Sequence, residues 1–303
     1  MTRSTLVVVL AGIASSGGWS SAAPIPERVQ EISAATLHGK VYIAGGIDST
    51  NRASARAYRF DPATNRWERI ADLPAPRHHM PLAVVGDTLY AVGGLSAGFD
   101  GQDNLWVYRE DRNVWEARAP LPQGRGASGV GVIGRTLIVV GGLGRGFAHV
   151  DSTALYDPAT NLWRAGAPIP TARDHLTAQA VGGLLFAIGG RPGNPDRNYA
   201  VVEAYDPVTD RWSTRSPMPS RRGGLAAAVL DGRIHTFGGE ARSSVFANHE
   251  VYDPVSDRWT VAAPLPTPRH GLGAATLAGR IYVVGGGPAA GFSQTSVTQV
   301  FVP

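Results

Sequence analysis

The stretch WRAGAPIPTARDHLTAQAVGGLLFAIGG, residues 163–190, contains the pattern that decides the fold. It opens on a tryptophan, has a proline seven residues later, and ends on a glycine pair that begins 26 residues after the tryptophan. The same arrangement occurs six times. The tryptophans are Trp19, Trp67, Trp115, Trp163, Trp212 and Trp259, and the pairs begin at Gly45, Gly93, Gly141, Gly189, Gly238 and Gly285. Because the steps between the pairs are 48, 48, 48, 49 and 47 residues, the chain is an internal repeat.

Each repeat predicts four short strands. In the quoted copy, residues 177–181 and 184–188 are apolar runs joined by Gly182-Gly183, a two-residue connection typical of a β-hairpin. A third strand ends on Tyr205 and is followed by Asp206-Pro207. Asp bonds the backbone of a type I turn and Pro presets its φ angle, so this dipeptide predicts a turn. The tryptophan of the next repeat then opens the fourth strand.

A four-stranded unit of this length cannot bury both of its faces alone, and six such units packed radially form a β-propeller. The glycine pair, the tyrosine about 14 residues later and the tryptophan beyond it resemble the Kelch repeat, whose period is about 50 residues. The resemblance covers residues 18–303 and implies an all-β, six-bladed propeller in a single domain. It says little about function, because propellers host catalysis, sugar binding and protein binding alike.

The last repeat predicts how the ring closes. It ends at Phe301-Val302-Pro303, which corresponds to Tyr252-Asp253-Pro254, so it lacks its own fourth strand. The missing piece reads WTVAAPLP in the preceding copy, and WSSAAPIP at residues 19–26 matches it. We therefore expect the segment around Trp19 to pair with the last blade and to remove its open edge.

Residues 1–17 are typical of a secretory signal peptide. One positive charge at Arg3 precedes an apolar stretch from Leu6 to Ala14, and small residues follow it. The stretch is too short to span a bilayer. We expect an exported protein, periplasmic or extracellular, without a membrane span, whose leader is cleaved before Trp19.

The composition fits a globular exported domain. Of the 303 residues, 43% are hydrophobic and 17% are charged, which allows a sizeable core. The chain has no cysteine, which excludes disulfides, thiolate metal sites and cysteine nucleophiles. The net charge of +4 is scattered along the chain, so no nucleic-acid partner is expected.

Arginine recurs three residues after the repeat proline in five of the six copies. These residues are Arg77, Arg125, Arg173, Arg222 and Arg269, and the first copy has Val29 there. Because they precede the innermost strands, we expect them to gather at one mouth of the central channel, where guanidinium groups clamp carboxylates. The resemblance to peptide-binding Kelch propellers implies the same placement. The alternative is that each arginine bonds carbonyls of the neighbouring blade as a structural residue of the repeat.

The position after each glycine pair offers a second candidate site. It holds Ile47, Leu95, Leu143, Arg191, Glu240 and Gly287. Glu240 is the one acid of this set, and Arg242 follows it. The segment Gly239-Glu240-Ala241 resembles part of the bacterial sialic-acid mutarotases, periplasmic Kelch propellers that interconvert sugar anomers. That resemblance implies proton transfer by Glu240, with Arg242 or Arg191 holding a carboxylate.

Histidines lie beside the arginines, at His78, His79, His175 and His270. Their offsets from the arginines differ, and adjacent residues such as His78 and His79 would point to opposite faces of a strand. Asp174 precedes His175, but no carboxylate joins the histidines at a recurring spacing. The sequence therefore predicts neither a metal site nor a cofactor.

Two functions follow from these patterns. The first is a monomeric exported module that binds a protein, a peptide or an anionic glycan at an arginine-lined channel mouth. The second is a sugar mutarotase or epimerase centred on Glu240. Because the repeat is regular and the sequence shows no convergent acid–base pair, the pattern favours the binding module over an enzyme.

Overall fold

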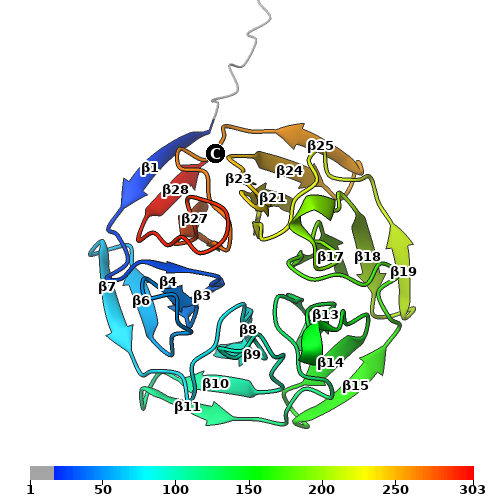
Figure 1. Ribbon diagram of the computed structural model, residues 1–303. Helices are drawn as coiled ribbons and strands as arrows, with labels where there is room; N and C mark the ends of the chain where they lie inside the picture. Colours follow the sequence, from blue (N-terminus) through cyan, green and yellow to red (C-terminus); the bar gives the residue numbers. More distant parts are fainter. Residues whose placement is uncertain (1–16) are drawn as a thin grey trace, which may run out of the picture.

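The computed structural model describes residues 17–303, which form six four-stranded sheets arranged as blades around an axis (Figure 1). From the axis outward, the first blade contains β3 (Ala34–Leu37), β4 (Lys40–Ala44), β6 (Ala57–Asp61) and β7 (Arg66–Ile70). The second contains β8 (Leu82–Val85), β9 (Thr88–Val92), β10 (Leu105–Arg109) and β11 (Val114–Ala117). The third contains β12 (Gly129–Ile133), β13 (Thr136–Val140), β14 (Thr153–Asp157) and β15 (Leu162–Gly166). The predicted six-bladed, all-β propeller is confirmed.

The other three blades follow the same order. The fourth contains β16 (Thr177–Val181), β17 (Leu184–Ile188), β18 (Val202–Asp206) and β19 (Arg211–Thr214). The fifth contains β20 (Ala226–Leu230), β21 (Arg233–Phe237), β24 (His249–Asp253) and β25 (Arg258–Val261). The sixth contains β26 (Gly273–Leu277), β27 (Arg280–Val284), β28 (Thr298–Val302) and β1 (Gly18–Ala22). Two small ribbons, β2 (Val29–Gln30) with β5 (Ile47–Asp48) and β22 (Glu240–Ala241) with β23 (Ser244–Val245), and two 3₁₀ turns, η1 (Arg145–Phe147) and η2 (Pro195–Arg197), decorate the loops.

The glycine pairs are required where neighbouring blades approach closely. Gly189 and Gly190 have φ angles of 63° and 99°, in the region that favours glycine. A Cβ atom on Gly189 would lie 2.7 Å from the carbonyl oxygen of Arg222, which belongs to the next repeat. A Cβ atom on Gly190 would lie 2.7 Å from the carbonyl oxygen of Asp174. Both contacts are with backbone, so side chains at these positions would push the inner loops apart.

The hydrophobic core lies between blades. Ile138 and Leu155 of the third blade pack with Leu185 and Tyr205 of the fourth, and all four are buried. Burying such a side chain stabilises the fold by roughly 1.5–3 kcal/mol. Each blade therefore depends on both of its neighbours for burial.

Each repeat tryptophan joins its blade to the preceding one. Its indole N–H donates to the carbonyl oxygen of the residue four positions after the previous tryptophan. For Trp67, Trp115, Trp163, Trp212, Trp259 and Trp19 the acceptors are Ala23, Ala71, Ala119, Ala167, Ser216 and Ala263, at 2.8 to 3.0 Å. Trp19 thus makes the same bond as the other five.

The N-terminal strand completes the last blade, as predicted. In Figure 1, β1 lies beside β28 at the outer edge of that blade, and the two strands pair antiparallel with Trp19 opposite Phe301. The Trp19 ring also lies edge-on to Phe237 of the fifth blade, with centroids 5.8 Å apart. The ring of blades is therefore closed by pairing the two ends of the described chain.

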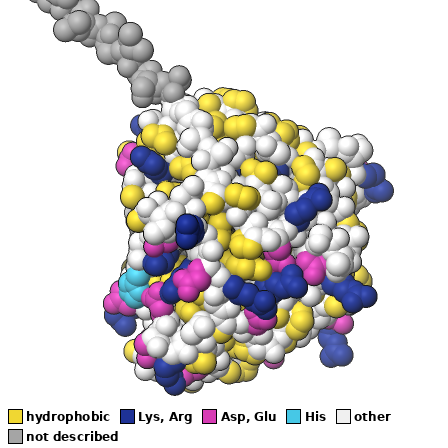
Figure 2. All heavy atoms as spheres, turned by 90° about the vertical axis from the view of Figure 1, so that its left-hand side faces the viewer, with side chains coloured by type: hydrophobic (Ala, Val, Ile, Leu, Met, Phe, Trp, Pro, Cys, Tyr) yellow, Lys and Arg dark blue, Asp and Glu magenta, His cyan; other side chains and the backbone are white. Residues whose placement is uncertain are grey.

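The predicted signal peptide, residues 1–17, lies outside the described residues except for Gly17. Within residues 17–303 no helix is long and apolar enough to cross a membrane. On the side wall shown in Figure 2, basic and acidic side chains are interspersed. Arg59, for example, lies 2.9 Å from Glu68 and 3.0 Å from Glu110.

In addition to the tryptophan bonds between blades, a ring of backbone hydrogen bonds surrounds the axis. One residue of each repeat, two positions after the repeat arginine, has left-handed backbone. These are Glu31, His79, Ala127, His175, Gly224 and Gly271, with φ between 51° and 66°. The N–H groups of His79, Ala127, His175, Gly224 and Gly271 each donate to the carbonyl of the preceding member at 2.8 to 2.9 Å, and Ile32 N–H completes the circle by donating to Gly271 at 3.2 Å. This ring holds six side-chain positions around one mouth of the channel.

The closure makes a testable prediction for stability. A chain starting at Pro24 lacks β1 and leaves β28 as an open edge, so it should melt several degrees below a chain starting at Gly17, because it loses the strand pairing with β28 and the packing of the half-buried Trp19. Trp19→Ala in the longer chain should lie between the two. Thermal melts followed by circular dichroism measure the difference, and equal melting temperatures would refute the closure.

Candidate functional site

A cavity of about 520 Å³ opens at the mouth surrounded by the ring of hydrogen bonds, and residues of all six repeats line it. Its polar lining includes Glu31, Asp174, Glu240, Arg191 and four histidines, His79, His149, His175 and His270. Farther along the channel, between the inner strands, the lining is mainly alanine, valine, glycine and threonine. Chemistry is therefore concentrated at one end of the propeller.

Three positions of the repeat supply the polar side chains. The first directly follows the repeat arginine, the second is the ring position, and the third follows the glycine pair. Backbone bridges join the first and third positions within each blade, as in Asp174 with Arg191 and His270 with Gly287. The ring position brings in Glu31, His79 and His175. The fold thus collects at the axis residues that are one or more repeats apart in sequence.

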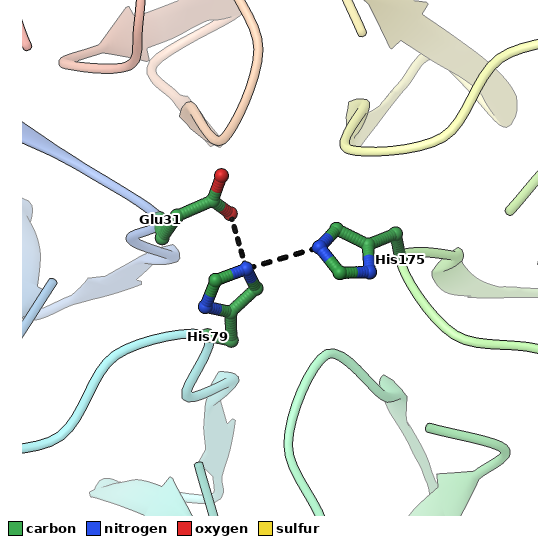
Figure 3. A group of neighbouring side chains, drawn as sticks. All are labelled: Glu31, His79 and His175. Carbon is green, nitrogen blue, oxygen red and sulfur yellow. Dashed lines mark hydrogen bonds and ion pairs between the residues drawn. The ribbon is translucent and has the colours of Figure 1, made fainter. Parts of the chain in front are cut away.

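Glu31, His79 and His175 meet closest to the axis (Figure 3). Nε2 of His79 lies 3.0 Å from Oε2 of Glu31 and 3.0 Å from Nε2 of His175, and both contacts in Figure 3 meet at this nitrogen. Gly271 leaves room for the carboxylate, since a Cβ atom there would lie 2.6 Å from it. The three side chains are at least nine-tenths buried.

Contacts at the Nδ1 atoms fix the orientation of the His79 and His175 rings. Nε2 of His78 lies 2.9 Å from the carbonyl oxygen of Ser96, and Nδ1 of His78 faces Nδ1 of His79. Nδ1 of His175 is hydrogen bonded to the Asp174 carboxylate. These contacts direct Nε2 of His79 and of His175 toward each other and toward Glu31.

A second group continues the network. Arg191 lies 2.8 Å from Oε1 of Glu240 and 2.7 Å from Nε2 of His175. Nε2 of His270 lies between two carboxylates, 3.4 Å from Glu240 and 3.5 Å from Glu31. Glu240 also accepts from the N–H of Gly291 at 3.2 Å. Acids, bases and one cation are therefore in contact across the cavity.

Burial and neighbouring charge set the ionisation of this network. Burial alone would raise the pKa of Glu31, but His79, with smaller contributions from His270 and His175, holds it well below its usual value. The pKa of Asp174 falls to about 2, because the pull of His175, Arg191 and His149 exceeds the effect of burial. Burial, reinforced by the charge of His79, lowers the pKa of His78 to about 3. Burial and Arg191 also lower the pKa of His175.

Aromatic side chains rise from three loops around the cavity. Phe99, Phe147 and Phe292 line it, and the last two are more than half exposed. Phe99 packs against His78 with ring centroids 4.6 Å apart. A polar floor with an aromatic rim is a common design of small-molecule sites.

Comparison with protein families agrees with this architecture. The model of the KLHDC2/KLHL20/DRC7 Kelch-repeats domain matches residues 15–169 and 120–287. The chain belongs to this Kelch family. The solved structure of YjhT, a bacterial Kelch protein, is similar to this propeller with a TM-score of 0.79 at 16% sequence identity, covering 93% of this chain and 97% of that one. No curated protein matches the chain.

The repeat arginines of this Kelch propeller do not line the cavity, so the predicted arginine-lined mouth is wrong. Arg125, Arg173, Arg222 and Arg269 are at most 1% exposed. Each donates to the carbonyl of the first glycine of its own blade's pair, namely Gly141, Gly189, Gly238 and Gly285, at 2.5 to 3.5 Å. Two of them also form buried ion pairs within the blade, Arg173 with Glu203 at 2.6 Å and Arg222 with Glu250 at 2.7 Å. These arginines are structural residues, but the carbonyls they bond belong to their own blade and not to the neighbouring one.

Of the other four predicted site residues, two lie outside the cavity and two line it. Arg77 is half-buried against its own blade, over the ring of Trp106 at 5.3 Å. Arg242 is exposed and pairs with Asp196 at 2.5 Å, away from the lining of the cavity. Arg191 and Glu240 do lie in the cavity and contact each other.

The sequence prediction did not include the histidines among the site residues, although four of them line the cavity. The sequence prediction placed His78 and His79 on opposite faces, whereas left-handed backbone at His79 turns the two rings into contact. Aligning the repeats would have shown that Glu31, His79 and His175 share one position, two residues after the arginine position. The apparent differences in offset arise because His78 and His270 belong to the neighbouring position of the repeat.

The burial of the arginines predicts an effect on stability. Arg173→Met should cost about 3–5 kcal/mol of unfolding free energy, because it leaves Glu203 buried without its partner. Adding Glu203→Leu should recover part of that loss, since replacing both members of a buried pair is far cheaper. Urea denaturation measures both. A single variant as stable as the wild type would contradict a structural role.

Proposed function

We propose that the cavity binds a small, hydroxyl-rich sugar bearing a carboxylate and interconverts its anomers, with Glu240 as the principal proton-transfer group. The observation behind the proposal is that acid and base side chains from several blades converge in one cavity, while the repeat arginines do not line it. Convergent titratable groups with shifted pKa values in a cavity are typical of catalytic sites.

Anomer exchange needs proton transfer and nothing else. A base removes the proton of the anomeric hydroxyl, an acid protonates the ring oxygen, and the bond from the anomeric carbon to the ring oxygen opens. Rotation about the adjacent carbon–carbon bond and reclosure from the other face return both protons, so the overall reaction balances without an oxidant or a reductant. Positioned side chains contribute about 10²–10⁴-fold to such steps.

Glu240 suits this chemistry because of its neighbours. One of its oxygens pairs with Arg191, and the other lies 3.4 Å from Nε2 of His270, which in turn lies 3.5 Å from Glu31. Glu240 can therefore take the proton of the anomeric hydroxyl, and an imidazole of the cavity such as that of His270 can protonate the ring oxygen. When the ring closes again, both protons return by the same groups.

Recognition of an acidic sugar rests on Arg191 and the aromatic rim. Among the described residues that line the cavity, Arg191 is the one guanidinium, and it is placed to attract a substrate carboxylate. Phe147 and Phe292 offer exposed rings to the apolar face of a sugar. The resemblance of Gly239-Glu240-Ala241 to the sialic-acid mutarotases supports the same substrate class.

The binding of a protein or peptide is less well supported, because its motivating arginines are buried. An anionic glycan remains within the proposal as a relative of the acidic sugar. Export to the periplasm or the medium and a monomeric state stay predictions from the sequence.

Exchange NMR of free sugars tests the proposal. Wild-type protein should accelerate anomer exchange of sialic acid, and Glu240→Gln should lower that rate by about 100-fold or more, because the amide cannot transfer the proton. Arg242→Gln is the matched control, since this neighbouring arginine is exposed, pairs with Asp196 and does not line the cavity, so the rate should be unchanged.

Neutral hexoses and hexuronic acids, measured in parallel, define the substrate class. Wild-type protein that accelerates none of these exchanges would exclude mutarotation. Saturation-transfer signals from a bound sugar, observed without exchange, would reduce the proposal to a binding function.

A further inference from the structure

We propose that Glu31, His79 and His175 form a binding site for a divalent transition-metal ion on the propeller axis. One carboxylate oxygen of Glu31 and one ring nitrogen of each histidine lie within 4.8 Å of one another, from three different repeats. Two imidazoles and one carboxylate are a ligand set of catalytic zinc sites and of non-haem iron sites, which keep further positions open. Here the open positions would face the cavity.

The hydrogen-bonding pattern leaves a place for a cation. The Ser96 carbonyl can only accept, so His78 donates to it from Nε2 and accepts at Nδ1. The facing Nδ1 of His79 then carries a hydrogen, and Nε2 of neutral His79 presents a lone pair. That lone pair is directed at the Glu31 carboxylate and at Nε2 of His175, both at 3.0 Å. Acceptors facing one another need a proton or a metal ion among them.

His175 is prepared in the same way. Its Nδ1 donates to the Asp174 carboxylate, so Nε2 carries the lone pair, which here accepts from Arg191. A carboxylate behind a histidine is the usual outer partner of a metal-binding imidazole, because it fixes the ring and raises the basicity of the outer nitrogen. His78 fixes the ring of His79 in a comparable manner. The orientation of each imidazole ring is therefore fixed by a contact at its Nδ1 atom.

The charge in the cavity also calls for a cation. Three buried carboxylates, from Glu31, Asp174 and Glu240, face one guanidinium, that of Arg191. With neutral histidines, two negative charges have no counter-charge among the described lining residues. Leaving charges buried and unpaired is costly, and one divalent ion balances both.

Arg191 must adjust when the ion binds. It gives up its hydrogen bond to Nε2 of His175 and keeps its ion pairs with Glu240 at 2.8 Å and Asp174 at 3.5 Å. Glu240 remains outside the ligand set. The metal site therefore stands independently of the proposed anomer exchange.

Calorimetric titration of the metal-freed full chain tests the inference. After treatment with EDTA, the protein should bind one Zn²⁺ or one Co²⁺ per chain, and Co²⁺ should show visible absorption bands of low-coordinate cobalt. His79→Gln and His175→Gln should each weaken binding by more than about 100-fold, and Asp174→Asn should weaken it by about 10–100-fold. His38 is an exposed histidine in the turn between β3 and β4 that does not line the cavity, so His38→Gln is the matched control and should bind like the wild type.

Melting curves separate binding from folding. Without metal, each variant should unfold cooperatively, and added Zn²⁺ should raise the melting temperature of the wild type and His38→Gln but not of His79→Gln. Absence of stoichiometric binding by the wild type, or equal affinity in His79→Gln, would overturn the inference and assign a proton to His79 instead. Glu240→Gln should still bind Zn²⁺, so a failed metal site and a failed exchange activity are distinguishable.

Discussion

The ring of backbone hydrogen bonds around the axis is the constraint on which the site depends. It joins one residue of every repeat to the next and requires left-handed backbone at each of the six positions. Glycine and alanine fill three of these positions, and the other three place Glu31, His79 and His175 at the channel mouth. The ring is complete only because β1 pairs with β28 and brings the first and last repeats together.

The arginines and the histidines illustrate two kinds of repeated position. In four blades the repeat arginine is a long donor that bonds the carbonyl of its glycine pair, as Arg173 does with Gly189, and such a residue is buried by the blade itself. The ring position carries no structural side chain, so its residues are free to differ between repeats. In this propeller, a residue type that recurs in most repeats has a structural role in the blade. Residues at the axis that differ between repeats are the candidates for a functional site.

Most of the fold follows from the sequence because its signals are local and repeated six times. The hairpin at Gly182-Gly183, the Asp206-Pro207 turn and the tryptophans each report on a few neighbouring residues, and their spacing defines the blades. Glu240 and Arg191 were also identified from the position after the glycine pair. His79 and Glu31 were not, because 48 residues separate them and neither forms a motif with its own neighbours.

The sequence by itself determined the six-bladed architecture and its closure by Trp19, since a regular period leaves one radial packing that covers every blade. Only the tertiary structure decided which side chains share the cavity. Closing a ring places equivalent positions of distant repeats a few ångströms apart, and left-handed backbone turns their side chains toward the axis. The repeat arginines, in contrast, are buried inside their own blades, where they bind backbone carbonyls and side chains such as Glu203 and Glu250.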